Sequence, residues 1–297
     1  MSAKLVLELL NYAEVLMMIM ALLMMVRAKE AKKYWAFTLL LAHRATYSTF
    51  LMLLVRYGKM WLGAKETYTI YYYAYWLTFV LDSALIVVTT YMIYRSAMEP
   101  LKGLQSLGNL VFKWAAGIST VVALAISCGH MVDTRHFIIS AASQMERAAS
   151  ILALSLLLFV CFAIRPMGLS YRSRIFAIVL GLGVNATLSM VGSGWVSSSM
   201  YNMYDRVNAI VALCVITGWS WYFAVPEPKR RFIMLPTTSP FLRWNHISEV
   251  LGHNPGYVVV GGFTPQDLAP AEIEVMRRAS LKAAESASRQ LAPSAAA

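Results

Sequence analysis

The sequence predicts an all-α integral membrane protein: a seven-transmembrane-helix bundle with its N-terminus outside and a small cytoplasmic C-terminal tail. Hydrophobic residues make up 59% of the 297 residues, charged residues make up 14%, and the mean hydropathy is +0.57. These values lie outside the range of soluble globular domains. Seven apolar stretches are each long enough to cross a bilayer, which takes roughly 20 residues of helix.

The seven predicted spans share this length and carry few charges. They cover residues 5–26, 34–55, 70–94, 110–128, 145–164, 175–196 and 203–225. The first span is expected to be a retained helix and not a signal peptide. No basic region precedes it, no small-residue cleavage pattern follows it, and a cluster of cations comes directly after it.

Lysine and arginine residues orient these spans. About thirteen of them fall in the loops on one side of the membrane and at the start of the tail, against about seven on the other side. Cytoplasmic loops carry the excess of positive charge, so we expect the N-terminus outside and the C-terminus in the cytoplasm. The net charge of +11 reflects these cations at span ends. The expected partner is therefore the lipid bilayer, and nucleic acid is not expected.

The chain divides into a seven-helix transmembrane domain, residues 1–225, and a cytoplasmic tail, residues 226–297. Several prolines from position 226 onward end any continuing helix. The tail is predicted to contain a short helix at 240–252, a strand-like run at 257–260 and a C-terminal helix at 271–290. It has too little apolar material to form an enzyme core, so we expect it to dock on a cytoplasmic protein partner.

Ionisable residues stand near the middle of three predicted spans: Glu14, Arg44 with His43 beside it, and Asp82. A charge at membrane depth costs roughly 2.5 kcal/mol or more, so each should face a partner, a cavity or a ligand. Counting about 1.5 Å per residue from the span ends places all three spans' charges in one central layer. We expect an ion pair between Arg44 and Asp82, or a cluster that also includes Glu14, retained for packing or for function. Together with Asn185, these residues form a buried polar cluster and a candidate ligand or switch site.

Polar and aromatic residues continue from this layer toward the outer surface. Glu8 and Asn11 precede the acidic residue of the first span at three-residue spacing, which places them along one helix face. Tyr72 and Tyr75 belong to the tyrosine-rich outer end of the third span, and Asn208 lies in the outer part of the seventh. We expect an outer polar and aromatic entrance. An interfacial aromatic belt and hydrogen bonds between helices are the alternative explanations.

The residue types also argue against several cofactors. Retinal would need a lysine within 203–225, which has none, and His43 is the only histidine well inside a span, so a bis-histidine haem lacks its second ligand. The histidines at 130 and 136 with Asp133 are too few to indicate a metal site. No nucleophile with a base can be assembled at matching depth. We therefore expect no cofactor, no metal and no catalytic residue, and hence no enzyme.

Two resemblances extend this interpretation. Seven helices with the N-terminus outside resemble the seven-helix sensor modules of bacterial histidine kinases. Three tail segments carry a second pattern: Arg243-Trp244-Asn245, Val250-Leu251-Gly252-His253 and 257–261. They resemble stand-alone seven-transmembrane-helix bacterial proteins of unknown function, which implies a multi-pass protein of the bacterial inner membrane. The kinase resemblance ends after residue 225, because no phosphoacceptor helix or ATP-binding domain fits in residues 226–297.

These observations favour a non-catalytic receptor or sensor-like protein that signals through a partner on its cytoplasmic tail, with a small molecule as its ligand. A small transporter or channel with a polar path is an alternative, although the spans show neither the internal repeats nor the interrupted helices common in transporters. A structural subunit of a membrane complex is a third hypothesis. The distance between Arg44 and Asp82, and the reach of any cavity to them, would separate these hypotheses.

Overall fold

The computed structural model is all-helical and describes residues 3–98, 102–128, 134–163, 170–195 and 201–227. Seven helices lie within these ranges: α1 (Ala3–Arg27), α2 (Trp35–Trp61), α3 (Ala64–Ala97), α4 (Lys102–Cys128), α5 (Thr134–Ala163), α6 (Arg174–Trp195) and α7 (Tyr201–Ala224). Six of them, all but α4, are long and apolar enough to cross a membrane. The chain therefore has the character of a multi-pass membrane protein. The predicted tail elements from residue 228 onward lie outside the described residues.

Four helices extend well beyond the predicted spans. α4 begins at Lys102, before the predicted start at residue 110. α2 ends at Trp61 and α3 begins at Ala64, so both are longer than expected and meet in a sharp turn. Gly63 makes this turn at φ +85°, in the left-handed region that favours glycine. α5 begins at Thr134, well before the predicted start at residue 145. Apolar residues on both sides of its polar stretch continue the helix, and span 137–162 is apolar enough to cross the membrane.

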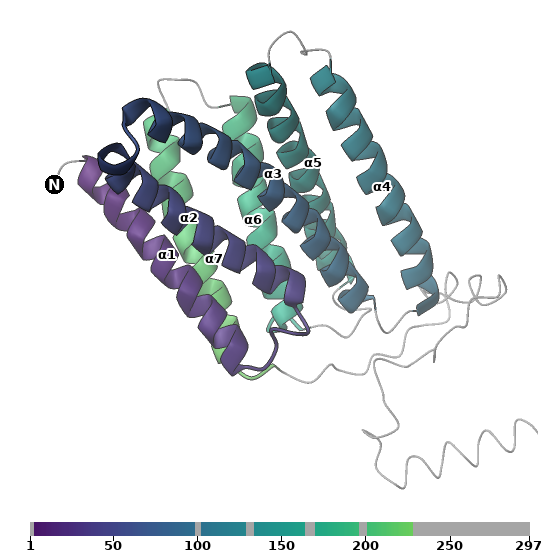
Figure 1. Ribbon diagram of the computed structural model, residues 1–297. Helices are drawn as coiled ribbons and strands as arrows, with labels where there is room; N and C mark the ends of the chain where they lie inside the picture. Colours follow the sequence, from purple (N-terminus) through teal and green to yellow (C-terminus); the bar gives the residue numbers. More distant parts are fainter. Residues whose placement is uncertain (1–2, 99–101, 129–133, 164–169, 196–200, 228–297) are drawn as a thin grey trace, which may run out of the picture.

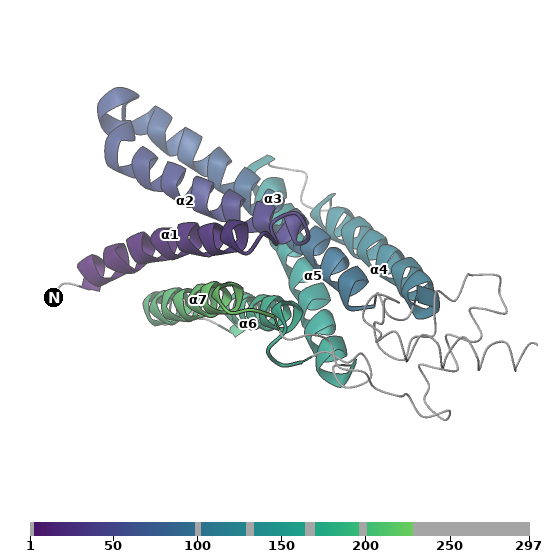
Figure 2. The ribbon, with the colours of Figure 1, turned by 90° about the horizontal axis from the view of Figure 1, so that it is seen from below.

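Six helices form a closed ring. Neighbours around the ring are α1, α2, α3, α5, α6 and α7, and α7 packs against α1 to complete it. α4 lies outside the ring, against α5 and, to a smaller extent, α3. Figures 1 and 2 show this arrangement from two sides, with α4 at the edge of the bundle beside α5. The interior of the ring is thus built without α4.

As far as the described residues show, the ring is tightly packed at one end. This packed end, where α1 finishes and α2 begins, holds most of the fully buried large side chains, including Phe37, Leu40, Ile178 and Trp219. Phe37 meets the Trp219 ring edge to face at a centroid distance of 4.9 Å. The indole N–H of Trp219 donates to the carbonyl oxygen of Ala177 at 2.9 Å, which joins α7 to α6. Such close packing fixes the ends of these helices relative to one another.

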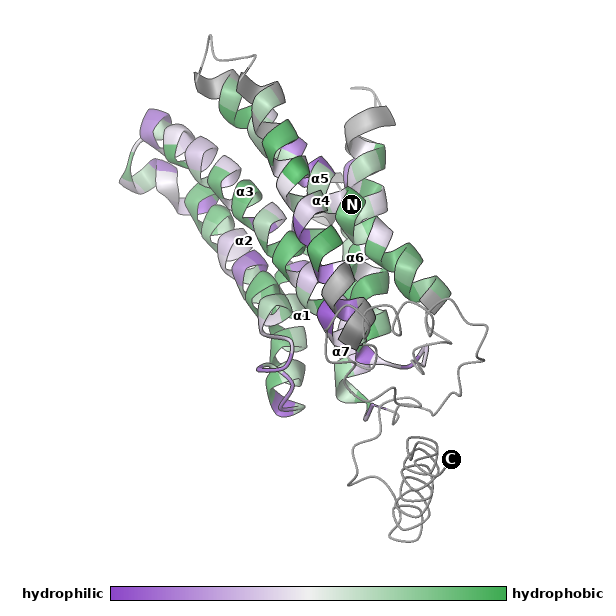
Figure 3. Cartoon of the chain, turned by 90° about the vertical axis from the view of Figure 1, so that its right-hand side faces the viewer, coloured by the Kyte–Doolittle hydropathy of each residue, from purple (hydrophilic) through white to green (hydrophobic). Residues whose placement is uncertain are grey.

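At the opposite end, called the open end below, few of the described residues are buried. In α1, for example, residues 8–17 are partly or fully exposed, and the buried side chains described in this helix lie at Met18 or beyond. Large apolar side chains cover the outside of the helices, and hydrophilic residues gather at the tip of the α2–α3 hairpin and at the loops (Figure 3). An apolar outer surface of this kind suits contact with lipid. Polar residues inside the ring therefore need partners within it.

Candidate functional site: a polar cavity inside the ring

An ion pair between α2 and α3 lies at the boundary between the packed and open ends. The Nε of Arg44 donates to Oδ1 of Asp82 at 2.7 Å, and its Nη2 donates to Oδ2 at 2.8 Å. This bidentate geometry is the strongest form of an arginine–carboxylate contact. Both side chains keep 17% of their surface exposed, so the pair borders open space and is not sealed in a dry core.

A second acidic residue enters the same layer from α5. Glu146 accepts a hydrogen bond from the hydroxyl of Ser189 on α6, with Oγ and Oε1 2.5 Å apart. Glu146 and the Arg44–Asp82 pair both line a small hollow between α3, α5 and α6. The layer thus extends across the ring. Among the described residues, it contains one guanidinium group and three carboxylates, those of Glu14, Asp82 and Glu146.

These side chains line a central cavity of about 260 Å³. Each of the six ring helices supplies at least one polar residue to its wall, and none of the described α4 side chains lines it. The polar lining residues are Glu14, Arg44, Tyr47, Tyr75, Thr78, Asp82, Glu146, Asn185, Ser189, Tyr204 and Asn208. The volume lies just below the usual range for small-molecule pockets, roughly 300 to 1,000 Å³. An apolar ring with a polar centre is the arrangement expected around a bound polar group.

A larger groove of about 730 Å³ leads from the open end to this cavity. It runs between α1 and α2 and shares Glu14, Tyr47 and Tyr75 with the central cavity. Glu8 and Arg56 stand at its outer rim, where Arg56 donates to the hydroxyl of Tyr12 at 3.0 Å. The groove therefore connects the central layer with the open end of the ring.

The predicted site residues are divided between these spaces. Asn185 and Asn208 line the central cavity, while Glu8 and Asn11 line the groove. Two predicted residues line neither. Nε2 of His43 lies 3.3 Å from the carbonyl oxygen of Thr78, so this histidine links α2 to α3. Tyr72 packs against the rings of neighbouring aromatic residues on its own helix.

Sequence reasoning missed Glu146, because the fifth span was expected to begin only one residue before it. The structure shows that α5 is already well inside the ring at this point. Buried residues of α5 recur at alternating spacings of four and three around Glu146, at Ala142, Ala149, Ala153, Leu156 and Val160. This spacing is the pattern of a buried helix face. Read along the sequence, it would have identified Glu146 as an inward-facing carboxylate.

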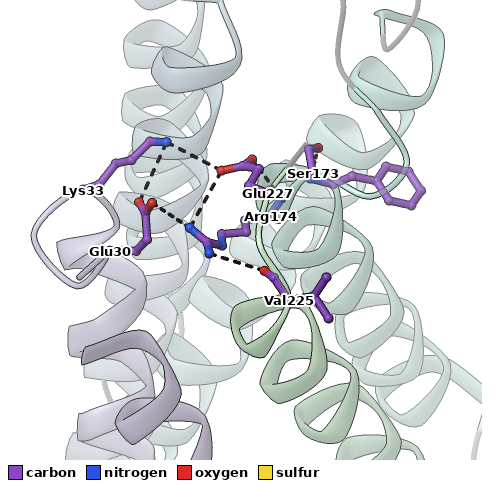
Figure 4. A network of polar contacts seen from close by, with 7 residues as sticks. Glu30, Lys33, Ser173, Arg174, Val225 and Glu227 are labelled. Carbon is purple, nitrogen blue, oxygen red and sulfur yellow. Dashed lines mark hydrogen bonds and ion pairs between the residues drawn. The ribbon is translucent and has the colours of Figure 1, made fainter. Parts of the chain in front are cut away.

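A separate ion-pair network closes the packed end (Figure 4). Arg174, the first residue of α6, donates to Glu30 at 2.6 Å in the α1–α2 loop and lies 4.0 Å from Glu227, just after α7. Lys33 lies 3.8 Å from Glu30 and 3.9 Å from Glu227. Two cations and two carboxylates thus join three segments.

The start of α6 is also capped. The hydroxyl of Ser173 accepts a hydrogen bond from the backbone N–H of Phe176.

Among the described residues, no group of three or more His, Cys, Asp or Glu side chains is placed to hold a metal ion. The two described cysteines, Cys161 and Cys214, are exposed and unpaired with each other. No family model, curated protein or solved structure matches the chain. The function of the chain is therefore inferred from the geometry of the cavity and the network.

Proposed function

We propose that this chain is a non-catalytic membrane receptor that binds a small molecule in the central cavity and signals through its C-terminal tail. One observation carries the proposal: a polar cavity, reached by the groove from the open end, lies above a tightly packed opposite end. A ligand can then enter from one side, while Phe37, Trp219 and Phe223 fill the ring on the other. Reception needs this one-sided access, whereas a channel needs a path through both ends.

The helices that line the cavity also end in the network around Arg174. α6 carries Ser189 in the cavity and begins at Arg174, and α7 carries Asn208 in the cavity and leads to Glu227. Glu227 is the second residue of the tail. A ligand that binds one arrangement of these helices more tightly than another shifts their equilibrium. Because interfaces of this kind have discrete arrangements, the shift reaches the tail through the network.

The orientation of the receptor is part of the proposal. The excess of cations near the packed end supports a cytoplasmic position for that end, by the positive-inside rule. The open end then faces the outside, and the tail reaches a cytoplasmic protein partner. Resemblance to bacterial seven-helix proteins supports the bacterial inner membrane as the location.

The first test measures whether the cavity and the packed end are coupled. Spin labels at Lys32 and Arg172, two exposed positions that flank the network, report the distance between the α1–α2 loop and the start of α6. The full chain, with its native cysteines replaced by serine, is measured in lipid nanodiscs with and without Asp82→Asn. We expect this change to alter the distance distribution. The matched control is Glu66→Gln at the exposed start of α3, and equal distributions in all three proteins would reject coupling.

A transporter seen with its cavity open on one side is the second candidate, because three carboxylates at the centre of a membrane ring are also suited to carrying protons. Proteoliposomes with an internal pH-sensitive dye separate the two functions. A receptor leaves an imposed pH gradient to decay as in protein-free vesicles. If the pH gradient decays faster with the protein than without it, and Glu146→Gln abolishes this difference, the function is proton-coupled transport and not reception.

A further inference from the structure

The connected groove and cavity contain more negative than positive groups. Four carboxylates line them, those of Glu8, Glu14, Asp82 and Glu146, against the guanidinium groups of Arg44 and Arg56. Asp82 neutralises Arg44 and accepts two hydrogen bonds from it. Glu8 and Arg56 balance each other at the exposed rim. The excess of acidic groups therefore belongs to the interior, at Glu14 and Glu146.

Among the described residues, neither of these two interior carboxylates forms an ion pair, and Arg44, the cation nearest to them in the cavity, is already paired with Asp82. The hydrogen-bond partner of Glu146 is the neutral hydroxyl of Ser189. The next residue, Arg147, is exposed and does not line the cavity. Within the described part of the chain, Glu14 has no hydrogen bond or ion pair, and it lines both the groove and the cavity. Acidic groups at this depth need a proton or a positively charged partner, and the space between them is open to a ligand.

Aromatic and apolar surfaces surround this space. Tyr47 and Tyr75 line both the groove and the cavity, and Phe79 lines the cavity. An ammonium group is attracted to the faces of such rings as well as to carboxylates. The groove between α1 and α2 adds an apolar wall, formed by Val15, Leu51, Met52 and Val55. The acidic centre and this apolar wall together suit a molecule with one charged end and an apolar body.

We infer that the ligand of this receptor is a small amphipathic amine. Its ammonium group lies in the central cavity, near Glu14 and Glu146, and its apolar body extends along the groove between α1 and α2. The inference rests on the proposed receptor function and adds the ligand class. It assigns Glu14 and Glu146 as binding residues, with Tyr47 and Tyr75 against the ammonium group, and leaves the Arg44–Asp82 pair as the wall behind it.

The test compares three probes of the same shape and different charge: phenethylamine, 2-phenylethanol and phenylacetate. The full chain is held in lipid nanodiscs, and binding is measured as the rise in unfolding temperature with probe concentration, since a ligand that binds only the folded state stabilises it. We expect phenethylamine alone to bind. Across benzylamine, phenethylamine and 3-phenylpropylamine, affinity should rise about fourfold for each added methylene buried in the groove.

Variants assign the binding to the two carboxylates. Glu14→Gln and Glu146→Gln should each weaken phenethylamine binding at least about tenfold, as expected when the buried anion of a charge-assisted contact is removed. Glu66→Gln, an exposed acidic residue at the start of α3, should leave binding unchanged. The two carboxylates lie on different helices, so either variant serves if the other fails to fold.

The outcomes separate the ligand class from the receptor function. Binding of phenethylamine that depends on Glu14 and Glu146 supports the inference. Equal binding of the alcohol or the acid, or amine binding unchanged in both Gln variants, overturns the ligand class. If no probe binds while Asp82→Asn still changes the spin-label distances at the packed end, the ligand class is wrong and the receptor function stands. If neither response occurs, both proposals fail.

Discussion

Two clusters are centred on an arginine, one in the middle of the ring and one at its packed end. They contain the same residue types but differ in charge balance. At the packed end, Arg174 is only 8% exposed and, with Lys33, balances Glu30 and Glu227. In the central cavity, Arg44 is paired with Asp82, while Glu14 and Glu146 form no ion pair within the part of the chain that the structure describes. A balanced network holds helix ends together. A cluster with unbalanced charge beside an open cavity is suited to binding a ligand.

The comparison predicts that the packed end contributes most to stability. Arg174→Met leaves Glu30 and Glu227 without their buried partner, and losing one member of a buried ion pair costs about 3 to 5 kcal/mol. The free energy of unfolding, measured by denaturant titration in bicelles, should fall by this amount. Arg172→Met, at an exposed position two residues earlier, is the control. Equal stability of the two variants would show that the network is not a structural clamp.

The central pair should contribute less, and its loss should be reversible. Asp82→Asn removes the charged acceptor of two hydrogen bonds, for which about 1.5 to 3 kcal/mol is typical. The double variant Arg44→Met with Asp82→Leu should recover most of this loss, because apolar residues of similar volume often replace a buried pair. The same unfolding titration measures both proteins. A double variant less stable than Asp82→Asn would mean that the pair itself supports the fold.

Helix spacing at the packed end offers a test that involves no charge. A Cβ added at Gly181 would come within 2.5 Å of the Trp219 ring, which is held by its hydrogen bond to Ala177. Gly181→Ala should therefore cost about 1 to 3 kcal/mol through overpacking. Gly117 on α4 has open space at the same position. Gly117→Ala should be neutral or stabilising by up to about 1 kcal/mol, and a similar loss in both variants would contradict tight packing at Gly181.

The smallest effect on stability is expected at Ser189. Its hydroxyl gives Glu146 a single hydrogen bond beside the open cavity, so Ser189→Ala should lower the free energy of unfolding by about 0.5 to 1.5 kcal/mol. Ser155→Ala, on the exposed side of α5 where the hydroxyl bonds only within its own helix, is the control and should change it less. A loss at Ser189 as large as that at Arg174 would remove the contrast between the clusters.

Part of this architecture follows from the sequence. Apolar stretches locate the helices, and counting residues from span ends brings Arg44 and Asp82 to one depth, where the structure joins them. Span lists, however, contain no information about which helices are neighbours, so the ring and the exclusion of α4 could not be derived. In the sequence, Arg174 is one of the loop cations that orient the spans, and nothing there indicates that its side chain is buried. In the sequence, an exposed loop cation cannot be distinguished from a cation in a buried network. The distinction requires the positions of the surrounding segments in the structure.

Glu146 illustrates a different limit. Hydropathy averages over a window and placed the start of the fifth span at residue 145, so Glu146 was expected at the edge of the membrane and not inside the ring. The spacing of small residues along α5 contains the missing information, since Ala142, Ala149 and Ala153 mark one buried face. Periodicity identifies inward-facing polar residues where average hydropathy does not.

The contact between α1 and α7 has a consequence for how the protein is made. It joins the first helix of the ring to leave the ribosome to the last, which ends at Ala224. At about 5 to 20 residues per second, α7 is complete on the order of 10 to 40 s after α1. During that interval the ring is open and Glu14 lies on a helix that still lacks one of its neighbours. Synthesis delivers Arg44 before Asp82 or Glu146, so the growing chain offers Glu14 a cation before it adds further acidic residues.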